Sequence, residues 1–79
     1  MKLSDQIKGI MAKVFEINVS EITDDATPEI IEKWNSLGHM NLIIALEEEF
    51  KITFEDEQIV ELVSFSAINE EISKLKPVV

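Results

Sequence analysis

Two side chains that could do chemistry, Ser36 and His39, stand close together in the stretch "WNSLGHMNLIIALEEEF" at residues 34–50. The chain has no cysteine, so it offers neither a thiol nucleophile nor a disulfide. A catalytic serine needs a base that a third group holds in place. His39 is the only histidine, and its neighbours Gly38 and Asn41 provide no acid to orient it. We therefore expect that this protein is not an enzyme.

Ser36 stands at the start of a helical pattern, which leaves two roles for its hydroxyl that involve no catalysis. One is structural, because a serine at the N-cap accepts a hydrogen bond from an unpaired backbone N–H of the first turn. The other is covalent attachment. A phosphate ester on Ser36 would lie where the free N–H groups and the helix macrodipole favour negative charge.

The spacing of apolar residues predicts an all-α protein. Apolar residues recur at intervals of three and four within residues 3–16, 36–50 and 65–75. Thr53 and Asp56 resemble a capping box, which predicts a short helix from there to about residue 62, and Ser64 or Ser66 can cap the last helix. Residues 18–34 have weak periodicity and read as a long loop, with one short turn after Thr27.

The predicted fold is a small four-helix bundle, with three longer helices, one short helix and a long loop between the first and second. No segment shows the period-two alternation of a strand. Seventy-nine residues allow one domain, which we expect to span residues 1–79. We expect Ile22, Ile30 and Ile31 to anchor the long loop to the core.

The charge balance is strongly acidic, with 16 Asp and Glu against 7 Lys and Arg. Such a surface repels nucleic-acid phosphates and attracts partners with basic surfaces. No run of apolar residues is long enough to insert into a membrane. The N-terminal residues lack the apolar segment of a secretory signal. We therefore expect a cytoplasmic, monomeric protein that neither binds nucleic acid nor inserts into a membrane.

The predicted helix at residues 36–50 carries two apolar stripes. At 100° per residue, one narrow arc faces the core and contains Leu42, Ile43, Leu46 and Phe50. The second arc, centred roughly 140° away, contains Leu37, Met40 and Ile44. A small bundle cannot bury both arcs, and a contiguous exposed apolar patch suggests a partner-binding surface. Asn41, Glu47 and Glu48 border the second arc.

The segment "NSLGHMNLIIALEEEF" closely resembles the phosphopantetheine-attachment segment of acyl carrier proteins, which typically reads Asp-Ser-Leu followed by "ALEEEF". The resemblance extends to length, acidity, the first helix, the long loop and the short third helix. It implies that a phosphopantetheinyl transferase modifies Ser36 with 4'-phosphopantetheine from coenzyme A. The thiol of that arm would carry acyl groups as thioesters, which the bundle can shelter by parting its helices.

The same resemblance implies which residues meet the partners. Leu37, Met40 and Ile44 match partner-contacting positions, and Glu47 and Glu48 match acidic residues that face basic patches. The implied partners are the transferase and the acyl-loading and acyl-processing enzymes of fatty-acid, lipid or specialised polyketide-type biosynthesis. The carrier itself catalyses nothing.

This sequence departs from the family pattern at four positions beside Ser36. Asn35 replaces the usual aspartate, and a charge-assisted contact reduced to a neutral one costs on the order of 1 kcal/mol, roughly fivefold in affinity. Gly38, His39 and Asn41 replace the acids or hydroxyls common in relatives of the fatty-acid pathway. Removing charge from the contact surface changes the affinity for one partner relative to another. We therefore hypothesise a specialised, freestanding carrier.

Two other classes compete with this reading. A calcium-binding EF-hand is excluded, because "DDATPEIIEKWN" has proline and isoleucine where oxygen ligands and the turn glycine belong. A helical interaction module without a prosthetic group stays open. It would use Leu37, Met40 and Ile44 for docking and Ser36 only as a cap.

Overall fold

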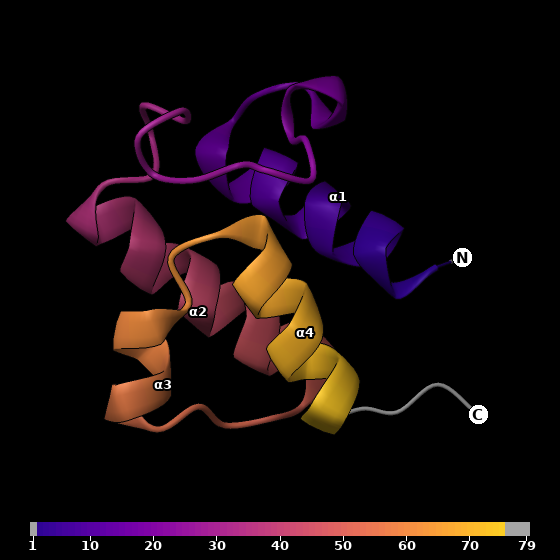
Figure 1. Ribbon diagram of the computed structural model, residues 1–79, viewed down its shortest axis with the longest axis vertical. Helices are drawn as coiled ribbons and strands as arrows, with labels where there is room; N and C mark the ends of the chain where they lie inside the picture. Colours follow the sequence, from indigo (N-terminus) through magenta and orange to yellow (C-terminus); the bar gives the residue numbers. More distant parts are fainter. Residues whose placement is uncertain (1, 76–79) are drawn as a thin grey trace.

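The computed structural model describes residues 2–75, and within them the chain forms helices and no strands. Figure 1 shows their arrangement, with α1 at the upper right, α2 running from the left to the centre, α4 overlapping the end of α2 in this view and the short α3 set to one side. The bounds are α1 Leu3–Phe15, η1 Val19–Glu21 (one 3₁₀ turn), α2 Ser36–Phe50, α3 Asp56–Glu61 and α4 Phe65–Leu75. The predicted all-α bundle with one short helix and a long first loop is confirmed.

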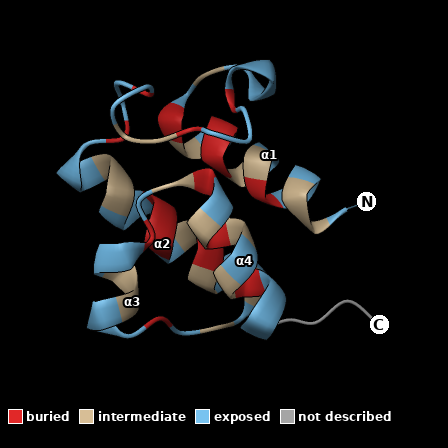
Figure 2. Ribbon diagram, viewed as in Figure 1, coloured by how far each residue is buried: buried red, intermediate tan, exposed pale blue. Residues whose placement is uncertain are grey.

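The core lies where α1 packs against α2 and α4. Each of these helices turns one apolar stripe inward, seen as the buried bands in Figure 2. The fully buried aliphatic residues of the three helices are Ile7, Met11, Leu42, Ile43, Leu46, Ile68 and Ile72. Burying each such side chain contributes about 1.5–3 kcal/mol before the entropy cost of folding, so this interface holds the bundle together.

Helix α2 presents its two stripes as predicted. Leu42, Ile43 and Leu46 are buried, and Phe50 is partly buried against the same core. The three residues of the second arc are exposed on the opposite side of the helix. Because α1 and α4 cover only one side of α2, the bundle leaves this arc in solvent.

The long loop is anchored at its ends and its middle. Ile22 and Ile31 are buried as predicted, but the prediction for Ile30 is wrong, because its side chain is 62% exposed. The backbone N–H groups of both Ile30 and Ile31 donate to the Thr27 carbonyl. Successive residues of such a tight turn point in different directions, so only one of the two isoleucines can face the core.

Two further contacts fix this loop to the rest of the bundle. The Phe65 N–H donates to the Ala26 carbonyl over 3.0 Å and joins the loop to the start of α4. Lys8 of α1 forms an ion pair of 2.8 Å with Asp24. The loop is therefore a packed part of the fold that can place the residues before α2.

The predicted capping box at the start of α3 is wrong. Helix α3 begins at Asp56, and its capping box joins Glu55 and Gln58 rather than Thr53 and Asp56. Phe54 is buried, and its N–H donates to the Glu47 carboxylate over 2.8 Å. These contacts keep Phe54 outside the helix, and Glu55 has the extended backbone of an N-cap, so the helix starts later than the sequence pattern indicated.

The predicted features of α4 are confirmed. The Ser64 hydroxyl accepts a hydrogen bond from the Ala67 N–H over 3.0 Å, which makes Ser64 the cap of the two candidates. Lys74 and Glu70 of this helix form an i,i+4 ion pair at 3.8 Å. Both side chains are exposed, so the pair adds little stability. No helix within residues 2–75 is long and apolar enough to cross a membrane.

Candidate functional site

Asn35, and not Ser36, caps α2. The Asn35 Oδ1 accepts a hydrogen bond from the Gly38 N–H over 2.9 Å, and the Asn35 carbonyl accepts one from His39 N over 2.7 Å. Ser36 is the first residue of the helix and is exposed. Its hydroxyl has no hydrogen-bond partner within residues 2–75. The interpretation of Ser36 as an N-cap is therefore wrong, and its oxygen is available to other molecules.

Gly38 allows the preceding loop to lie directly against the first turn of α2. A Cβ atom at this position would overlap the Lys33 backbone carbonyl oxygen and press on the Asn35 side chain. Only glycine fits without a shift of the backbone. The close approach places Asn35 over the helix end, where it can act as the cap.

His39 cannot act as a base for Ser36. The Trp34 Nε1–H donates to His39 Nδ1 over 2.9 Å, and His39 Nε2 lies 2.8 Å from the Ile59 carbonyl oxygen. An indole N–H is a donor only, so Nδ1 must be unprotonated, and Nε2 carries the proton and donates to Ile59. Both ring nitrogens are occupied. The arrangement contains no activated serine.

A shallow hollow of about 340 Å³ opens beside Ser36. Its lining comes from the long loop, the start of α2 and the segment between α3 and α4, and consists of Pro28, Trp34, Asn35, Ser36, His39 and Val63. The sequence analysis missed three of these residues. Only Trp34 is a near neighbour of Ser36 in sequence, whereas Pro28 and Val63 are brought there by the fold.

The predicted docking strip, formed by Leu37, Met40 and Ile44, lies on the surface of α2. These side chains are 72%, 45% and 49% exposed, respectively. Asn41 and Glu48 beside them are also exposed. The structure thus brings the predicted apolar residues and two of their polar neighbours to one accessible helix.

Glu47 differs from the other predicted docking residues. It is only partly exposed, and its carboxylate accepts the hydrogen bond from the Phe54 N–H. Its charge therefore helps to order the segment between α2 and α3. The sequence analysis missed Val60 and Val63, two exposed apolar residues on and just after α3.

The surroundings of Ser36 suit a phosphate ester. The N–H groups of Ser36 and Leu37 have no hydrogen-bond partner in the described part of the chain, and the first turn of α2 contains no acidic residue. Free N–H groups and the positive end of a fifteen-residue helix both favour a bound phosphate. Among the described residues no cluster of three or more His, Asp or Glu side chains could hold a metal ion.

The comparisons with known proteins agree with this geometry. The family model for the phosphopantetheine attachment site matches residues 5–72, which is most of the chain. A search of curated proteins gives no significant match. Domains of this family carry covalently attached 4'-phosphopantetheine and serve as carriers of acyl groups. The chain therefore belongs to the phosphopantetheine-attachment family, the family of carrier domains that includes the acyl carrier proteins.

Proposed function

We propose that this protein is an acyl carrier whose phosphopantetheine arm is attached to Ser36. The proposal rests on the exposed Ser36 hydroxyl. This hydroxyl is not needed to cap α2, because Asn35 is the cap. The chain also belongs to the phosphopantetheine-attachment family. When attached, the arm supplies a terminal thiol on which acyl groups are held as thioesters. The protein presents them to other enzymes and catalyses no step itself.

The attachment is a phosphoryl transfer from coenzyme A. The Ser36 oxygen attacks the phosphorus that bears the pantetheine, and a new O–P bond forms. The bond from that phosphorus to the bridging oxygen of the diphosphate breaks, and adenosine bisphosphate leaves. Because His39 has no free nitrogen, the serine proton must pass to a base on the transferase. The free N–H groups of the first turn of α2 would favour the negative charge of an ester phosphate on Ser36.

The proposed partners are the phosphopantetheinyl transferase and the acyl-loading and acyl-processing enzymes. The exposed strip formed by Leu37, Met40 and Ile44 supplies apolar contact area. Asn41 and Glu48 stand at its polar edge, and the acidic surface attracts enzymes with basic patches. We assign Glu47 a smaller part in docking, because the Phe54 N–H already occupies its carboxylate.

We further propose that the carrier serves a dedicated pathway. Gly38 and His39 have roles in packing within this fold, so their departure from the family pattern says little about partners. Asn35 and Asn41 are exposed, and the hypothesis rests on them. Turnover by general fatty-acid synthase enzymes, measured as acyl-chain elongation on the loaded carrier, should be poor. Efficient elongation would remove this part of the proposal.

The decisive experiment is an intact mass measurement before and after incubation with coenzyme A and a broad-specificity transferase. We expect a gain of one phosphopantetheine in the natural chain and none in Ser36→Ala. The Ser36→Ala chain is a sound control, because its fold keeps the Asn35 cap. A natural chain that gains nothing, while a control carrier is fully converted, would contradict the proposal if Asn35→Asp fails as well.

An unmodified interaction module is the alternative that this experiment tests. It would keep its partner when Ser36 is changed to alanine and lose it with Ile44→Arg. A carrier loses its function with either change. Partner binding that survives in Ser36→Ala, together with no gain of mass in the natural chain, would favour the module.

A further inference from the structure

Helix α3 is the least firmly attached helix of the bundle. It has six residues, and none of them is buried. The extensive helix packing involves α1, α2 and α4, and Figure 2 shows α3 as exposed or only partly buried along its length. The buried residues Phe54 and Leu62 lie just outside its two ends. Within α3, Ile59 is partly buried against the core, and side-chain hydrogen bonds add to what holds the helix in place.

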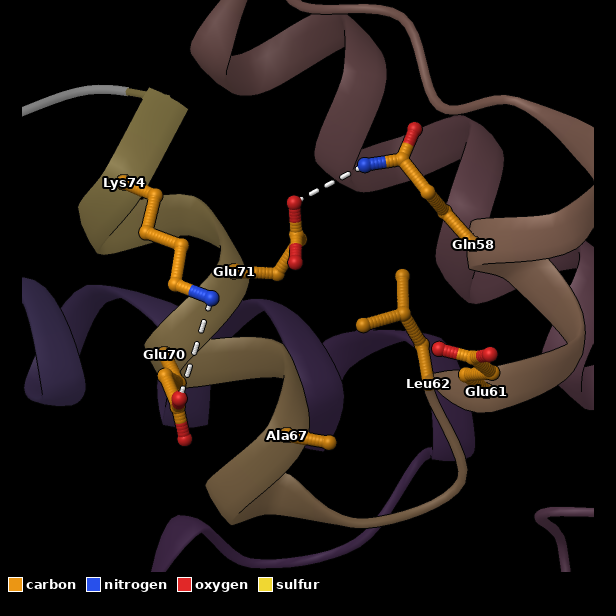
Figure 3. Close-up of a pocket in the computed structure, with 7 residues that line it drawn as sticks. All are labelled: Gln58, Glu61, Leu62, Ala67, Glu70, Glu71 and Lys74. Atoms are coloured by element: carbon orange, nitrogen blue, oxygen red, sulfur yellow. Dashed lines mark hydrogen bonds and ion pairs between the residues drawn. The ribbon is translucent and has the colours of Figure 1, made fainter.

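One of these bonds joins α3 to α4. The Gln58 Nε2–H donates to a Glu71 carboxylate oxygen over 2.8 Å. Figure 3 shows this bond spanning a small cleft, with Leu62 and Ala67 at its apolar side and the Lys74–Glu70 pair at its rim. The bond is remote from Ser36 and holds α3 from the side of α4.

The other bond joins α3 to the mouth of α2 through His39. The Nε2–H donates over 2.8 Å to the Ile59 carbonyl near the C-terminal end of α3, which also accepts a longer hydrogen bond of 3.3 Å from the Leu62 N–H. The opposite ring nitrogen accepts from Trp34, whose side chain is buried and whose ring lies edge to edge with the imidazole, at an angle of 23°. Trp34 thus fixes the ring that holds α3.

We propose that His39 is a positioning residue that latches α3 over the core, and that release of this latch admits an apolar acyl chain. The His39 ring lines the hollow beside Ser36 and also holds α3. Leu46 and Leu62 are buried, so a chain that starts at Ser36 can contact them only if the helices part. The role in admitting cargo rests on the proposed carrier function, whereas the latch can be tested without any cargo.

The first arm of the test uses the unmodified chain and backbone hydrogen exchange. His39→Leu keeps the side-chain bulk but removes both hydrogen bonds. It should lower the protection of the Ile59 and Leu62 amides about fivefold or more, since the lost hydrogen bonds no longer oppose local opening of α3. His39→Gln should restore protection, because its amide can accept from Trp34 and donate to Ile59 without titrating.

Gln58→Ala is the matched control on the other side of α3. It should also lower the protection of α3 but leave exchange of the Trp34 indole N–H unchanged, whereas His39→Leu should speed that exchange. If His39→Leu does not fold, Trp34→Phe can be used instead, because it removes the hydrogen bond that Trp34 donates to His39. Its effect is measured by exchange of the same Ile59 and Leu62 amides. Equal protection of the α3 amides in His39→Leu and in the natural chain would overturn the proposal. Failure of His39→Gln to restore that protection would also overturn it.

In the second arm of the test, the transferase attaches octanoyl-phosphopantetheine from octanoyl coenzyme A to Ser36. Hydroxylamine then cleaves the thioester at a rate that reports its exposure. We expect slower cleavage in His39→Leu than in the natural chain, because a released α3 shelters the cargo more often, and a return to the natural rate in His39→Gln. Identical rates would overturn the cargo role. Absence of loading by mass in both the natural chain and Asn35→Asp would remove the carrier function, and the first arm would still decide the latch.

Discussion

Asn35 and Ser36 are adjacent residues that divide two tasks at the start of α2. The Asn35 side chain satisfies the Gly38 N–H and so stabilises the helix end. The Ser36 side chain stays exposed and has no partner in residues 2–75. Because the structural task belongs to one residue and the proposed chemical task to the other, each can be removed without the other.

Substitutions at this pair should separate stability from modification. Asn35→Ala should lower the free energy of unfolding by about 1 kcal/mol through loss of the cap. Ser36→Ala should change it by less than about 0.5 kcal/mol, as is usual for a surface change without lost contacts. Asn35→Asp should keep the cap and speed the transferase. Denaturant unfolding and transferase kinetics measure these effects, and equal destabilisation by both alanine changes would contradict the assignment.

The sequence pattern suggested only Ser36 as a cap and gave no reason to assign the cap to Asn35. Asparagine and serine are both strong N-cap residues, and the start of a helix is uncertain by a residue or two from pattern alone. The missing information is the path of the loop, which approaches α2 closely enough to bring Asn35 over the helix end only because Gly38 has no side chain. Such a contact across chain segments has no signature in local spacing.

At the scale of the helices, the two glycines give opposite predictions for the same substitution. Gly9 in α1 is exposed, with open space where a Cβ would lie. Gly9→Ala should therefore raise the free energy of unfolding by about 0.5–1 kcal/mol. Gly38→Ala should lower it by about 1–3 kcal/mol, because the added methyl group forces the loop backbone away.

Thermal or denaturant unfolding of the two variants tests this difference directly. Helix propensity alone favours alanine at both sites. A decrease in the free energy of unfolding for Gly38→Ala would therefore be due to the close approach of the Lys33 carbonyl. A second measurement is the rate of modification of Gly38→Ala by the transferase, which should also fall as the loop before Ser36 shifts. If both substitutions stabilise the protein, the loop before α2 can shift at little cost and the prediction for Gly38 is wrong.

Apolar periodicity predicted α1, α2 and α4 well, because each buries one broad stripe against its neighbours. It predicted α3 poorly at its start, since a six-residue helix has too few turns for a pattern and is placed by contacts such as Phe54 with Glu47. It also gave the long loop a wrong anchor at Ile30. Which side of a turn faces the core depends on tertiary packing that the sequence does not express locally.

At the scale of the whole molecule, the net charge of −9 should govern association with partners. Long-range attraction speeds encounter with a basic surface and is screened by salt. The association rate with the transferase should therefore fall by about tenfold or more from low to high ionic strength. Surface plasmon resonance at several salt concentrations measures it.

A variant of the docking strip is the control for this experiment. Leu37→Ala removes apolar contact without changing charge, so it should speed dissociation while keeping the same dependence of association on salt. An association rate that does not respond to salt would contradict electrostatic steering.

The buried indole of Trp34 has a practical consequence. It is the sole tryptophan in a chain without tyrosine, so nearly all near-ultraviolet absorption and emission arises at one ring, two residues from Ser36. That ring packs on Phe15 and donates to His39, so its emission responds to changes at the mouth of α2. Unlabelled protein should therefore report, in real time, every enzyme that modifies or docks at this end of the bundle.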